Sequence, residues 1–528
     1  MRTWIRTTGA VLAGGLLVAI VLLAASCHGD KGKPSATLDS GPDFFRDVTT
    51  DSGINFTYRN GEEAGNYAIL ESLGGGVALF DYDRDGWPDL LVTGWGRVAL
   101  YHNEPIDPAD PAKGRKLVEV TAKAGLDDKL WSTSAAFGDL DGDGWPDLYI
   151  AHYVDWSFDN NPKCAGYSSD ISRDVCPPLR FKGLPHSVYR NNGDGTFTDM
   201  SSKAGLRRAD SKDGDAGKGL GVVIADLNGD GKPDIYVAND TVPKFLYFNR
   251  GGWKLEEAGL RSGAAVDERG VAQGSMGIDI ADIDGSGLPA IFVTNYENEM
   301  HALYKNLGDE QFQFNTAASG IASIGQSFVG FGTRFLDFDN DGWPDLAIGN
   351  GHVIRHPRFN PLAQRPILFR NQGKGKFVQA SMRGGSYFKI PHRGRGLAVG
   401  DLDNDGRPDI VISHIDEPVA LLRNIAGEEG PRNHWIGFTL ARKDRRDAIG
   451  SRVIVEAGGR ELVWFVRAGG SYLSSSDPRL LFGLASADKI DRVRVEWSHG
   501  GKQEWAGADL AVDRYWVLRE DAIKPSEK

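Results

Sequence analysis

Asp81-Tyr82-Asp83-Arg84-Asp85-Gly86-Trp87-Pro88-Asp89 is the first of six copies of one pattern. Acids or amides stand at positions 1, 3 and 5, Gly at position 6 and Asp at position 9, so that side-chain oxygens converge from alternate positions. The glycine permits the sharp turn that lets the backbone carbonyl of position 7 join them. The pattern therefore predicts a Ca²⁺-binding loop. The other copies begin at Asp139, Asp226, Asp282, Asp337 and Asp401.

We expect positions 1, 3, 5 and 9 to bind Ca²⁺ through side chains and position 7 through its carbonyl. The third copy has Asn228 at position 3, which keeps an oxygen, whereas the fourth has Ser286 at position 5 and Ala290 at position 9. We therefore expect four strong Ca²⁺ sites, an intermediate third site and a fourth that is weak or absent. The expected ligands are Asp81, Asp83, Asp85, Trp87 and Asp89; Asp139, Asp141, Asp143, Trp145 and Asp147; Asp226, Asn228, Asp230, Lys232 and Asp234; Asp282, Asp284 and Ser286; Asp337, Asp339, Asp341, Trp343 and Asp345; and Asp401, Asp403, Asp405, Arg407 and Asp409.

The loops are not EF-hands, which require a bidentate Glu at position 12 and flanking helices. Position 12 of the first copy is Val92, in the apolar run Leu90–Thr93. Such runs predict strands, and a small-residue strand precedes each loop, as in Gly75–Phe80. Each loop is therefore the predicted tip of a β-hairpin. An Asp/Gly-rich turn without metal would explain one copy, but it explains six copies in register poorly.

The loop starts are separated by 58, 87, 56, 55 and 64 residues. A period of this size in an all-strand pattern predicts a propeller with one four-stranded blade per repeat. The last repeat lacks its fourth strand, and the strand-like segment Phe45–Thr49 stands unpaired at the other end of the predicted domain. We expect the two to pair and close a ring of six blades. A ring of seven blades, in which one blade lacks the motif, is the alternative.

The region 433–520 reads as a second all-β domain, with short alternating strands such as Glu461–Val466 and Arg492–Trp497 separated by glycine turns. We expect its Trp and Arg residues to be core aromatics and a solvated face, with a sugar-stacking or anion-binding surface as the alternative. The predicted fold class is all-β: a Ca²⁺-binding β-propeller over 44–427, a small β-sandwich-like domain over 428–520 and a tail over 521–528.

The repeated motif resembles the FG-GAP/VCBS repeats, which are also found in the seven-bladed propellers of integrin α-subunits. Four later phrases resemble the ASPIC/UnbV domain: Asn433–Gly437, Arg446–Val453, Arg467–Leu473 and Ser476–Leu484. The combination resembles bacterial relatives of the cartilage acidic protein family, from which the eroded fourth loop departs. This resemblance implies an extracytoplasmic Ca²⁺-binding protein and supplies no catalytic residues.

Residues 1–26 are a predicted lipoprotein-type signal peptide. Arg2 and Arg6 form a positive region, Gly9–Ala25 is an uncharged apolar run, and small residues precede Cys27, the expected lipidation site. An uncleaved membrane anchor is the alternative. His28 after the cysteine favours an outer-membrane or cell-surface location, and residues 27–43 read as a flexible tether.

Cys164 and Cys176 lie in one Pro/Gly/Ser/Asp-rich insertion, and in an oxidising compartment they are expected to form a disulfide. The formal net charge of −12 argues against nucleic acid as a partner. The loop carboxylates account for this charge, and bound Ca²⁺ would bring the protein near neutrality.

No G-x-S-x-G, H-E-x-x-H, Walker or dinucleotide motif occurs in the chain. We therefore predict a cell-surface interaction module for an unidentified protein or glycan. A polysaccharide-active or redox propeller enzyme and a scaffold of an envelope assembly are the alternatives. Strand direction puts all Ca²⁺ loops on one face of the disc, so we expect the ligand on the other face, where the longer loops emerge. The candidate ligand-contacting residues are Asn239, Asp240, Asn295, Glu297 and His352.

Overall fold

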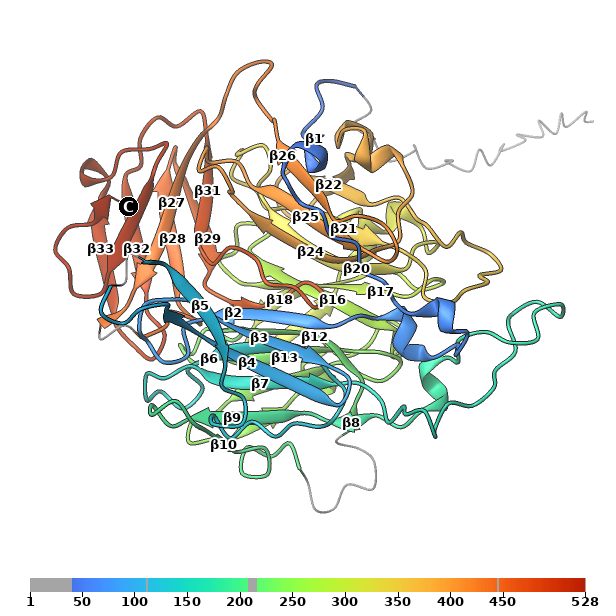
Figure 1. The fold of residues 1–528 in the computed structure, drawn as a ribbon. Coiled ribbons are helices and arrows are strands. Elements are labelled where there is room, and N and C mark those ends of the chain that lie inside the picture. Colours follow the sequence, from blue (N-terminus) through green and yellow to red (C-terminus); the bar gives the residue numbers. More distant parts are fainter. Residues whose placement is uncertain (1–39, 111–112, 208–215, 444–445, 528) are drawn as a thin grey trace, which may run out of the picture.

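The structure is a computed structural model that describes residues 40–110, 113–207, 216–443 and 446–527. The predicted signal peptide and Cys27 lie outside the described residues. Six four-stranded antiparallel sheets surround a common axis, and a second β domain lies at one side of the disc (Figure 1). Within the described part of the chain, no helix is both long and apolar enough to cross a bilayer.

Blades 1, 3, 4 and 5 each contain four consecutive strands, β8 intervenes within blade 2, and the last blade takes its fourth strand from the other end of the domain. Blades are numbered in chain order, and within a blade the strands are given from the axis outward. Blade 1 is β2 (Gly76–Phe80), β3 (Asp89–Gly94), β4 (Arg97–Pro105) and β5 (Arg115–Glu119). Blade 2 is β6 (Ser132–Gly138), β7 (Asp147–His152), β9 (Ser187–Asn191) and β10 (Phe197–Asp199). Blade 3 is β12 (Gly219–Ala225), β13 (Asp234–Asn239), β14 (Phe245–Asn249) and β15 (Leu255–Glu257).

The remaining blades follow the same order. Blade 4 is β16 (Ser275–Ala281), β17 (Ala290–Asn295), β18 (Ala302–Gly308) and β19 (Gln311–Phe314). Blade 5 is β20 (Gly330–Leu336), β21 (Asp345–Asn350), β22 (Ile367–Asn371) and β23 (Phe377–Gln379). Blade 6 is β24 (Gly394–Gly400), β25 (Asp409–His414), β26 (Ala420–Asn424) and β1 (Phe45–Asp47). Short elements lie between them: β8 (Leu184–Pro185), β11 (Ala216–Gly217), α1 (Gly259–Ser262) and α2 (Thr316–Ser319).

The pairing of β1 with β26 confirms the predicted completion of the last blade, with Phe45 opposite Asn424. The innermost strands of blades 2 to 5 are buried along their whole length, because neighbouring blades cover both of their faces. The strand β2 is different: Val77 and Leu79 are 42% and 58% exposed. The packing between blade 6 and blade 1 is therefore looser than the other contacts between blades.

The C-terminal domain is a sandwich of two four-stranded sheets. One sheet contains β31 (Leu480–Ala485), β27 (His434–Ala441), β34 (Tyr515–Arg519) and β35 (Ser526–Glu527), with β27 and β34 parallel. The other contains β29 (Arg460–Phe465), β28 (Arg452–Ala457), β32 (Arg492–Glu496) and β33 (Lys502–Ala506). Trp435, Trp464, Trp497 and Trp505 are buried, which confirms that they are core aromatics.

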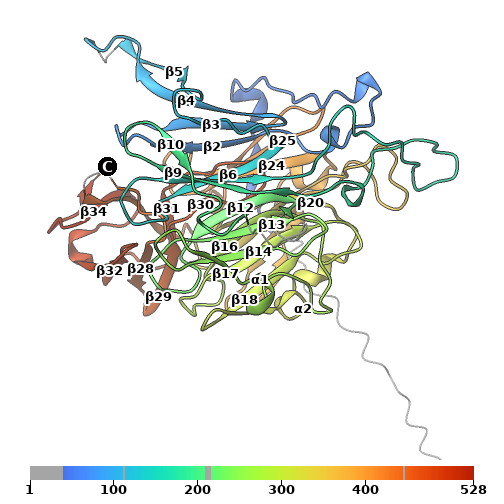
Figure 2. The ribbon, with the colours of Figure 1, turned by 90° about the horizontal axis from the view of Figure 1, so that it is seen from below.

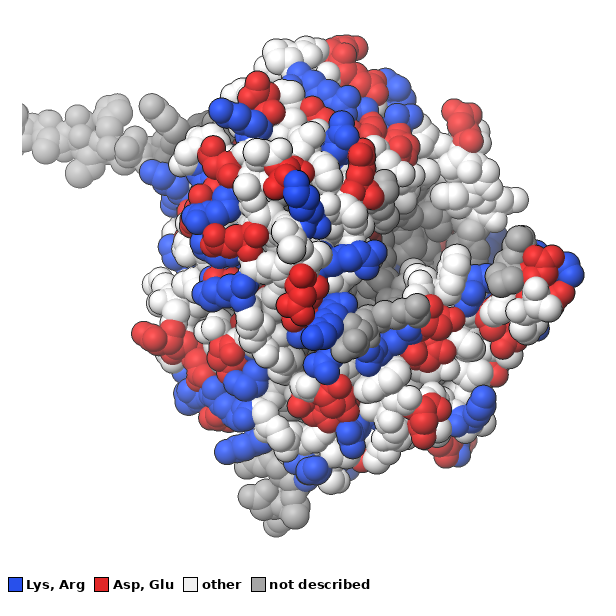
Figure 3. All heavy atoms as spheres, turned by 90° about the vertical axis from the view of Figure 1, so that its left-hand side faces the viewer, with Lys and Arg blue, Asp and Glu red and all other residues white. Residues whose placement is uncertain are grey.

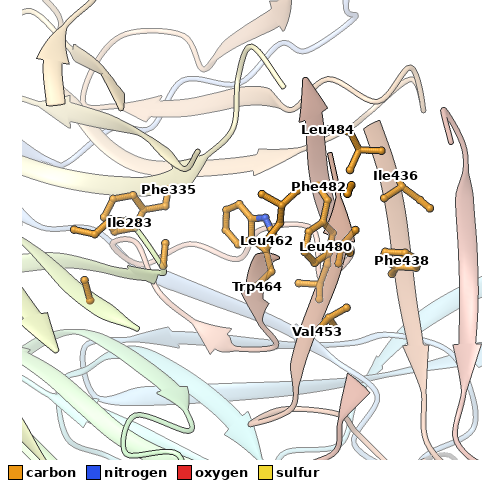
Figure 4. Packing of buried hydrophobic residues seen from close by; sticks show 14 of the residues in the cluster. Ile283, Phe335, Ile436, Phe438, Val453, Leu462, Trp464, Leu480, Phe482 and Leu484 are labelled. Carbon is orange, nitrogen blue, oxygen red and sulfur yellow. The ribbon is translucent and has the colours of Figure 1, made fainter. Parts of the chain in front are cut away.

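The apolar core of this domain continues into the propeller (Figure 4). Leu462 and Trp464 of β29 point toward Ile283 and Phe335 of blades 4 and 5, and all four belong to one buried cluster. Burial of apolar surface stabilises proteins by about 25 cal/mol per Å². The C-terminal domain is therefore packed onto the disc by hydrophobic contact. The view from below shows this domain beside the propeller strands (Figure 2).

The segment between β29 and β31, residues 466–477, enters the centre of the propeller; we call it the axial segment. Its short strand β30 (Ala468–Gly469) pairs with β12, and the Ser471 amide donates to the carbonyl of Ile278. The Ser471 hydroxyl donates to the carbonyl of Leu397 in blade 6. The fully buried ring of Tyr472 packs edge-on against Phe331 of blade 5, with centroids 4.9 Å apart. The C-terminal domain therefore fills the propeller axis.

Candidate calcium sites

The loops between the first and second strands of each blade adopt one shared conformation. In every loop a carboxylate oxygen of the position-1 Asp accepts the backbone N–H of the position-6 Gly. The six distances are 2.8 Å at Asp81, 2.9 Å at Asp139, 2.9 Å at Asp226, 2.8 Å at Asp282, 2.8 Å at Asp337 and 2.8 Å at Asp401. This bond closes the turn and turns the side chains at positions 3 and 5 inward. The repeat therefore forms six copies of one acidic loop.

The position-9 Asp begins the second strand and binds two backbone amides. In blade 2, Asp147 accepts the N–H of Leu140 at 2.9 Å and that of Asn191 at 3.0 Å. The side chain of Asn191 then donates to the carbonyl of Tyr82 in the preceding blade at 2.8 Å. The same pair of acceptor bonds recurs at Asp89, Asp234, Asp345 and Asp409. The position-9 Asp, where present, therefore links the loop to its own blade, and in blades 2 to 6 the asparagine of the third strand links the blade to the preceding one.

The donor set suits a hard divalent cation. Carboxylate oxygens of the residues at positions 1, 3 and 9 lie within 4.8 Å of one another in the first, second and fifth loops. Oxygens bound to one Ca²⁺ at 2.3–2.6 Å are at most about 5 Å apart. Buried oxygens without a hydrogen-bond partner, Asp81 Oδ1 and Asp339 Oδ1, belong to these loops. The arrangement therefore fits Ca²⁺.

Burial, and then the neighbouring carboxylates, raise the pKa of loop acids. The pKa of Asp341 is raised to about 6, first by burial and then by the charge of Asp339. The pKa values of Asp337 and Asp345 in the same loop are raised well above their usual range for the same reasons. Like charges at this distance disfavour the ionised form unless a cation neutralises them. The loop is therefore electrostatically unfavourable without a positive partner.

The fourth loop keeps its fold with a poorer donor set. Asp282 accepts the N–H groups of Gly285 at 2.9 Å, Ser286 at 3.0 Å and Gly287 at 2.8 Å. Ala290 supplies no carboxylate, and Lys305 contacts Asp284 at 2.7 Å. The bonds of Asp282 hold the turn, whereas two of the ligands present elsewhere are weakened or missing.

Basic side chains that contact the loop acids were not predicted from the sequence. They stand directly before the asparagine of the third strand and contact the acids at positions 3 and 5. The contacts are His102 to Asp83 at 2.9 Å, Arg190 to Asp143 at 2.8 Å, Lys305 to Asp284 at 2.7 Å, Arg370 to Asp341 at 2.6 Å and Arg423 to Asp403 at 2.6 Å. The signal was available, because a basic residue precedes the asparagine in five of the repeated third strands. The lysine and the three arginines among them offset part of the loop charge.

The C-terminal domain docks on the face that carries the loops. The Arg460 guanidinium donates to the carbonyls of Asp341 and Gly342 at 2.9 and 2.8 Å and lies 4.5 Å over the Trp343 ring. The Tyr515 hydroxyl donates to the position-1 carboxylate of Asp401 at 2.7 Å. Further contacts reach loops 2, 3 and 4: His499 Nε2 to the Asp139 carbonyl at 2.8 Å, the His499 amide to the Gly231 carbonyl at 2.7 Å, and Arg452 to the Gly287 carbonyl at 3.0 Å. The domain therefore contacts five of the six loops.

The outer side of the C-terminal domain carries both signs of charge, interspersed (Figure 3). Arg492 binds Glu456 and Glu504, and Lys502 binds Glu496 at 2.8 Å. Such cross-strand pairs neutralise one another locally. The face in this view therefore presents no large field of a single sign.

The five candidate ligand-contacting residues lie on the opposite face, but four of their side chains are buried and that of Asp240 is half-buried. Asn239 and Asn295 each donate to a carbonyl of the next turn, Pro243 at 2.9 Å and Met300 at 2.7 Å. The Tyr153 hydroxyl donates to the carboxylate of Asp240 at 2.5 Å. The expectation that these polar residues face a ligand is corrected, because turn backbones need partners for their carbonyls and amides. Glu297 and His352 are buried as well, with Glu297 Oε2 2.5 Å from Asn360 Nδ2 and Glu297 Oε1 3.4 Å from His352 Nε2.

The loops of this opposite face expose aromatic side chains instead. Trp95 and Phe158 are 40% and 64% exposed and pack on the buried Trp156, with ring centroids 5.1–5.7 Å apart. The insertion that follows is joined by a disulfide between Cys164 and Cys176, as the sequence predicted. Tyr167, Leu179 and Phe359 are also exposed. The opposite face therefore carries apolar contact groups on a cross-linked set of loops.

The chain resembles two known families along most of its described length. A family model described as FG-GAP-like repeat matches residues 81–150, 185–237, 226–293, 282–348 and 360–412, and one described as ASPIC and UnbV matches residues 441–525. Cartilage acidic protein 1 of Homo sapiens is 25% identical over 444 residues, which cover 82% of this chain and 61% of that protein. The Xenopus tropicalis protein of the same name is 23% identical over 445 residues, covering 82% and 63%. The chain thus spans about three fifths of the length of these relatives.

Solved structures resemble the chain only at low similarity. A structure of an Agrocybe aegerita lectin that recognises non-reducing terminal N-acetylglucosamine has a TM-score of 0.37 and 16% identity, covering 67% of this chain and 81% of that one. The rhamnogalacturonan lyase YesW has a TM-score of 0.31 and 16% identity, covering 90% and 84%.

Proposed function

Because the chain belongs to the FG-GAP-like repeat family and ends in an ASPIC and UnbV domain, we propose that it is a calcium-stabilised, extracytoplasmic interaction module. The observation that carries the proposal is a structural difference between the two faces of the propeller. One face gathers the acidic loops beneath the C-terminal domain, and the other leaves aromatic loops exposed. Bound Ca²⁺ would neutralise the loop carboxylates and fix the backbone that the C-terminal domain contacts.

Four strong Ca²⁺ sites, an intermediate third loop and a weak fourth loop are part of this proposal. The complete sets of four acids in loops 1, 2, 5 and 6 support it, as does the missing acid at Ala290. Extracellular modules bind Ca²⁺ with dissociation constants of about 10⁻⁴–10⁻³ M. Saturation at 100 times the dissociation constant stabilises a protein by about 2.7 kcal/mol per independent site. Calcium would therefore act as a structural cofactor here.

We propose that the partner, a protein or a glycan, binds the face that carries the aromatic cluster. Aromatic side chains offer large contact area, and Trp95 is half-exposed beside Phe158. A rigid scaffold with long loops is a common way to present such a surface.

The test measures capture of envelope proteins and binding to a glycan array by purified protein in Ca²⁺. The double variant Trp95→Ala/Phe158→Ala should lose at least tenfold in binding. Trp87→Ala is the matched control, because Trp87 is an exposed tryptophan on the calcium-loop face. Binding that survives the double variant, or that is lost only in the control, would place the contact surface elsewhere. Turnover of an array polysaccharide would favour an enzyme instead.

We also propose that Cys27 carries lipid and holds the protein at an outer membrane or cell surface. The positive region, the apolar run and the small residues before Cys27 support this attachment. Metabolic labelling with palmitate should mark the wild-type protein and leave Cys27→Ser unlabelled and unprocessed. An intact N-terminus on the mature wild-type protein would instead indicate an uncleaved anchor.

A further inference from the structure

A second group of ligand-type side chains lies on the propeller face opposite the acidic loops. His392 precedes β24, His414 ends β25, and Glu417 follows in the turn to β26. One ligand atom from each lies within 4.8 Å of the other two. Two imidazoles and one carboxylate are a nitrogen-rich set, unlike the oxygen-only donors of the calcium loops.

The ring of His414 is held in one tautomer by its neighbours. Nδ1 lies 2.6 Å from the Pro418 carbonyl, which only accepts, so Nδ1 carries the proton and donates it. Nε2 lies 2.6 Å from the Tyr387 hydroxyl and is left as the acceptor. A carbonyl bound to one ring nitrogen is the usual support for a histidine that ligates metal through the other. The Nε2 lone pair of His414 thus accepts the Tyr387 hydroxyl in this structure, and a metal ion bound through Nε2 would displace that hydrogen bond.

His392 and Glu417 are held at the rim of the same cluster. His392 Nδ1 lies 2.9 Å from Glu417 Oε2, and the imidazole stacks on Tyr387 with centroids 4.2 Å apart. The second ring nitrogen, Nε2, is buried without a hydrogen-bond partner. Glu417 Oε1 accepts the backbone N–H of Arg393 at 3.0 Å. The Glu417 side chain is 32% exposed, which leaves a route from solvent to the cluster.

Blade 2 shows what the same strand position looks like when it is purely structural. His152 ends β7 as His414 ends β25, and its Nδ1 faces the Pro185 carbonyl at 2.7 Å. Its Nε2 faces the buried carboxylate of Asp128 at 2.9 Å. Both ring nitrogens of His152 therefore have hydrogen-bond partners within the protein. Blade 6 replaces that carboxylate with a tyrosine hydroxyl and adds His392 and Glu417.

We propose that His392, His414 and Glu417 bind one divalent transition-metal ion of the zinc class. Imidazole and carboxylate donors suit Zn²⁺ and its first-row neighbours, whereas Ca²⁺ prefers oxygen ligands throughout. Three protein ligands leave further coordination positions for water or a ligand from solvent, beside the Tyr387 hydroxyl. The Arg393 guanidinium is bound to Asp416 at 2.8 Å and to Glu62 at 3.1 Å, so its charge is offset beside the site.

The test titrates the full protein with Zn²⁺ by calorimetry in saturating Ca²⁺, which occupies the acidic loops. His392→Gln and Glu417→Gln should each weaken zinc binding at least tenfold. His434→Gln is the matched control, because His434 Nδ1 contacts the Asp513 carboxylate at 2.7 Å in a partly exposed pair like that of His392 and Glu417. A thermal melt without zinc, unchanged among the variants, confirms that all of them fold.

The competing location is the first calcium loop, where His102 Nε2 lies 2.9 Å from Asp83 Oδ2. A His102→Gln variant should keep the zinc affinity of the wild type. Zinc binding that persists in both His392→Gln and Glu417→Gln, or that is lost in His102→Gln, would overturn the proposal. A Co²⁺ complex whose visible absorption disappears in Glu417→Gln and persists in His434→Gln would support it independently.

Discussion

Arg467 of the axial segment and Asp279 of blade 4 form a two-pronged ion pair near the propeller axis. Nε lies 2.7 Å from Oδ1 and Nη2 lies 3.0 Å from Oδ2. Asp279 also accepts the backbone N–H of Phe335 at 2.7 Å and contacts Arg334 Nη1 at 3.2 Å. All three charged side chains are almost completely buried. The C-terminal domain is thus built into the propeller core.

We expect Arg467→Met to lower the free energy of unfolding by about 3 kcal/mol. Removing one partner of a buried ion pair leaves an uncompensated charge, which costs about 3–5 kcal/mol, and the remaining Arg334 puts the effect near the lower end. Denaturant unfolding measures the loss. Arg514→Met, which removes the exposed pair with Glu527, is the control and should cost less than about 1 kcal/mol. Equal effects of the two substitutions would show that the axial pair contributes no more to the free energy of unfolding than an exposed ion pair does.

The docking of the C-terminal domain predicts a reciprocal coupling to Ca²⁺. Arg460 binds the Asp341 and Gly342 carbonyls of the fifth loop, so Arg460→Ala should weaken Ca²⁺ binding there by roughly tenfold, which corresponds to about 1.4 kcal/mol. Calorimetric titration measures the change. Arg494→Ala, on another strand of the same domain, serves as the control. An unchanged affinity in Arg460→Ala would mean that docking and metal binding are independent.

Restoring the missing ligands should strengthen the fourth site. In the other loops the position-9 Asp accepts two backbone amides, and Ala290 occupies that position in the fourth. Ser286→Asp/Ala290→Asp should therefore add about one Ca²⁺ per chain at saturation, or tighten an existing weak site at least tenfold. Elemental analysis after dialysis counts the ions. No gain would indicate that Lys305, bound to Asp284, already fills the role of the metal.

The buried His301 predicts a loss of stability in acid. Burial lowers its pKa to about 4, from 6.5, and its Nδ1 accepts the backbone N–H of Asn295 at 3.1 Å. Because the unfolded chain then binds the proton more tightly, stability falls as pH drops from 6.5 to 4. His301→Gln should flatten this dependence by at most about 3 kcal/mol, since one pKa unit corresponds to 1.36 kcal/mol. Denaturant unfolding across this pH range, in excess Ca²⁺, measures the dependence. Equal slopes of the free energy of unfolding against pH in the two proteins would contradict the prediction.

Much of the propeller could be predicted from the repeat alone. The fixed spacing of the acidic loops sets the blade period, and the unpaired segment at Phe45 identified the strand that completes blade 6. The ligand positions follow from the same repeat, because a loop that repeats in sequence repeats in conformation.

The contacts between the two domains could not be predicted in the same way. The axial segment contains Gly469, Gly470 and Ser471 and reads as an ordinary loop, yet it crosses the propeller centre. Its glycines lie at φ +69° and +87°, and a Cβ on Gly469 would meet the Val222 carbonyl at 2.4 Å. The requirement for glycine depends on this contact with the propeller and therefore could not be predicted from the sequence. The prediction that Asn239 and Asn295 contact a ligand was wrong for a related reason. Their polar side chains bind turn backbones inside the protein.

Calcium uptake by the metal-free protein, measured by equilibrium dialysis at millimolar Ca²⁺, tests the central claim most directly. We predict at least four Ca²⁺ per chain, and one fewer in a variant whose fifth loop carries Asp337→Asn and Asp345→Asn. Uptake of less than one ion per chain, or equal uptake by this variant, would contradict the assignment of the repeated loops as calcium sites.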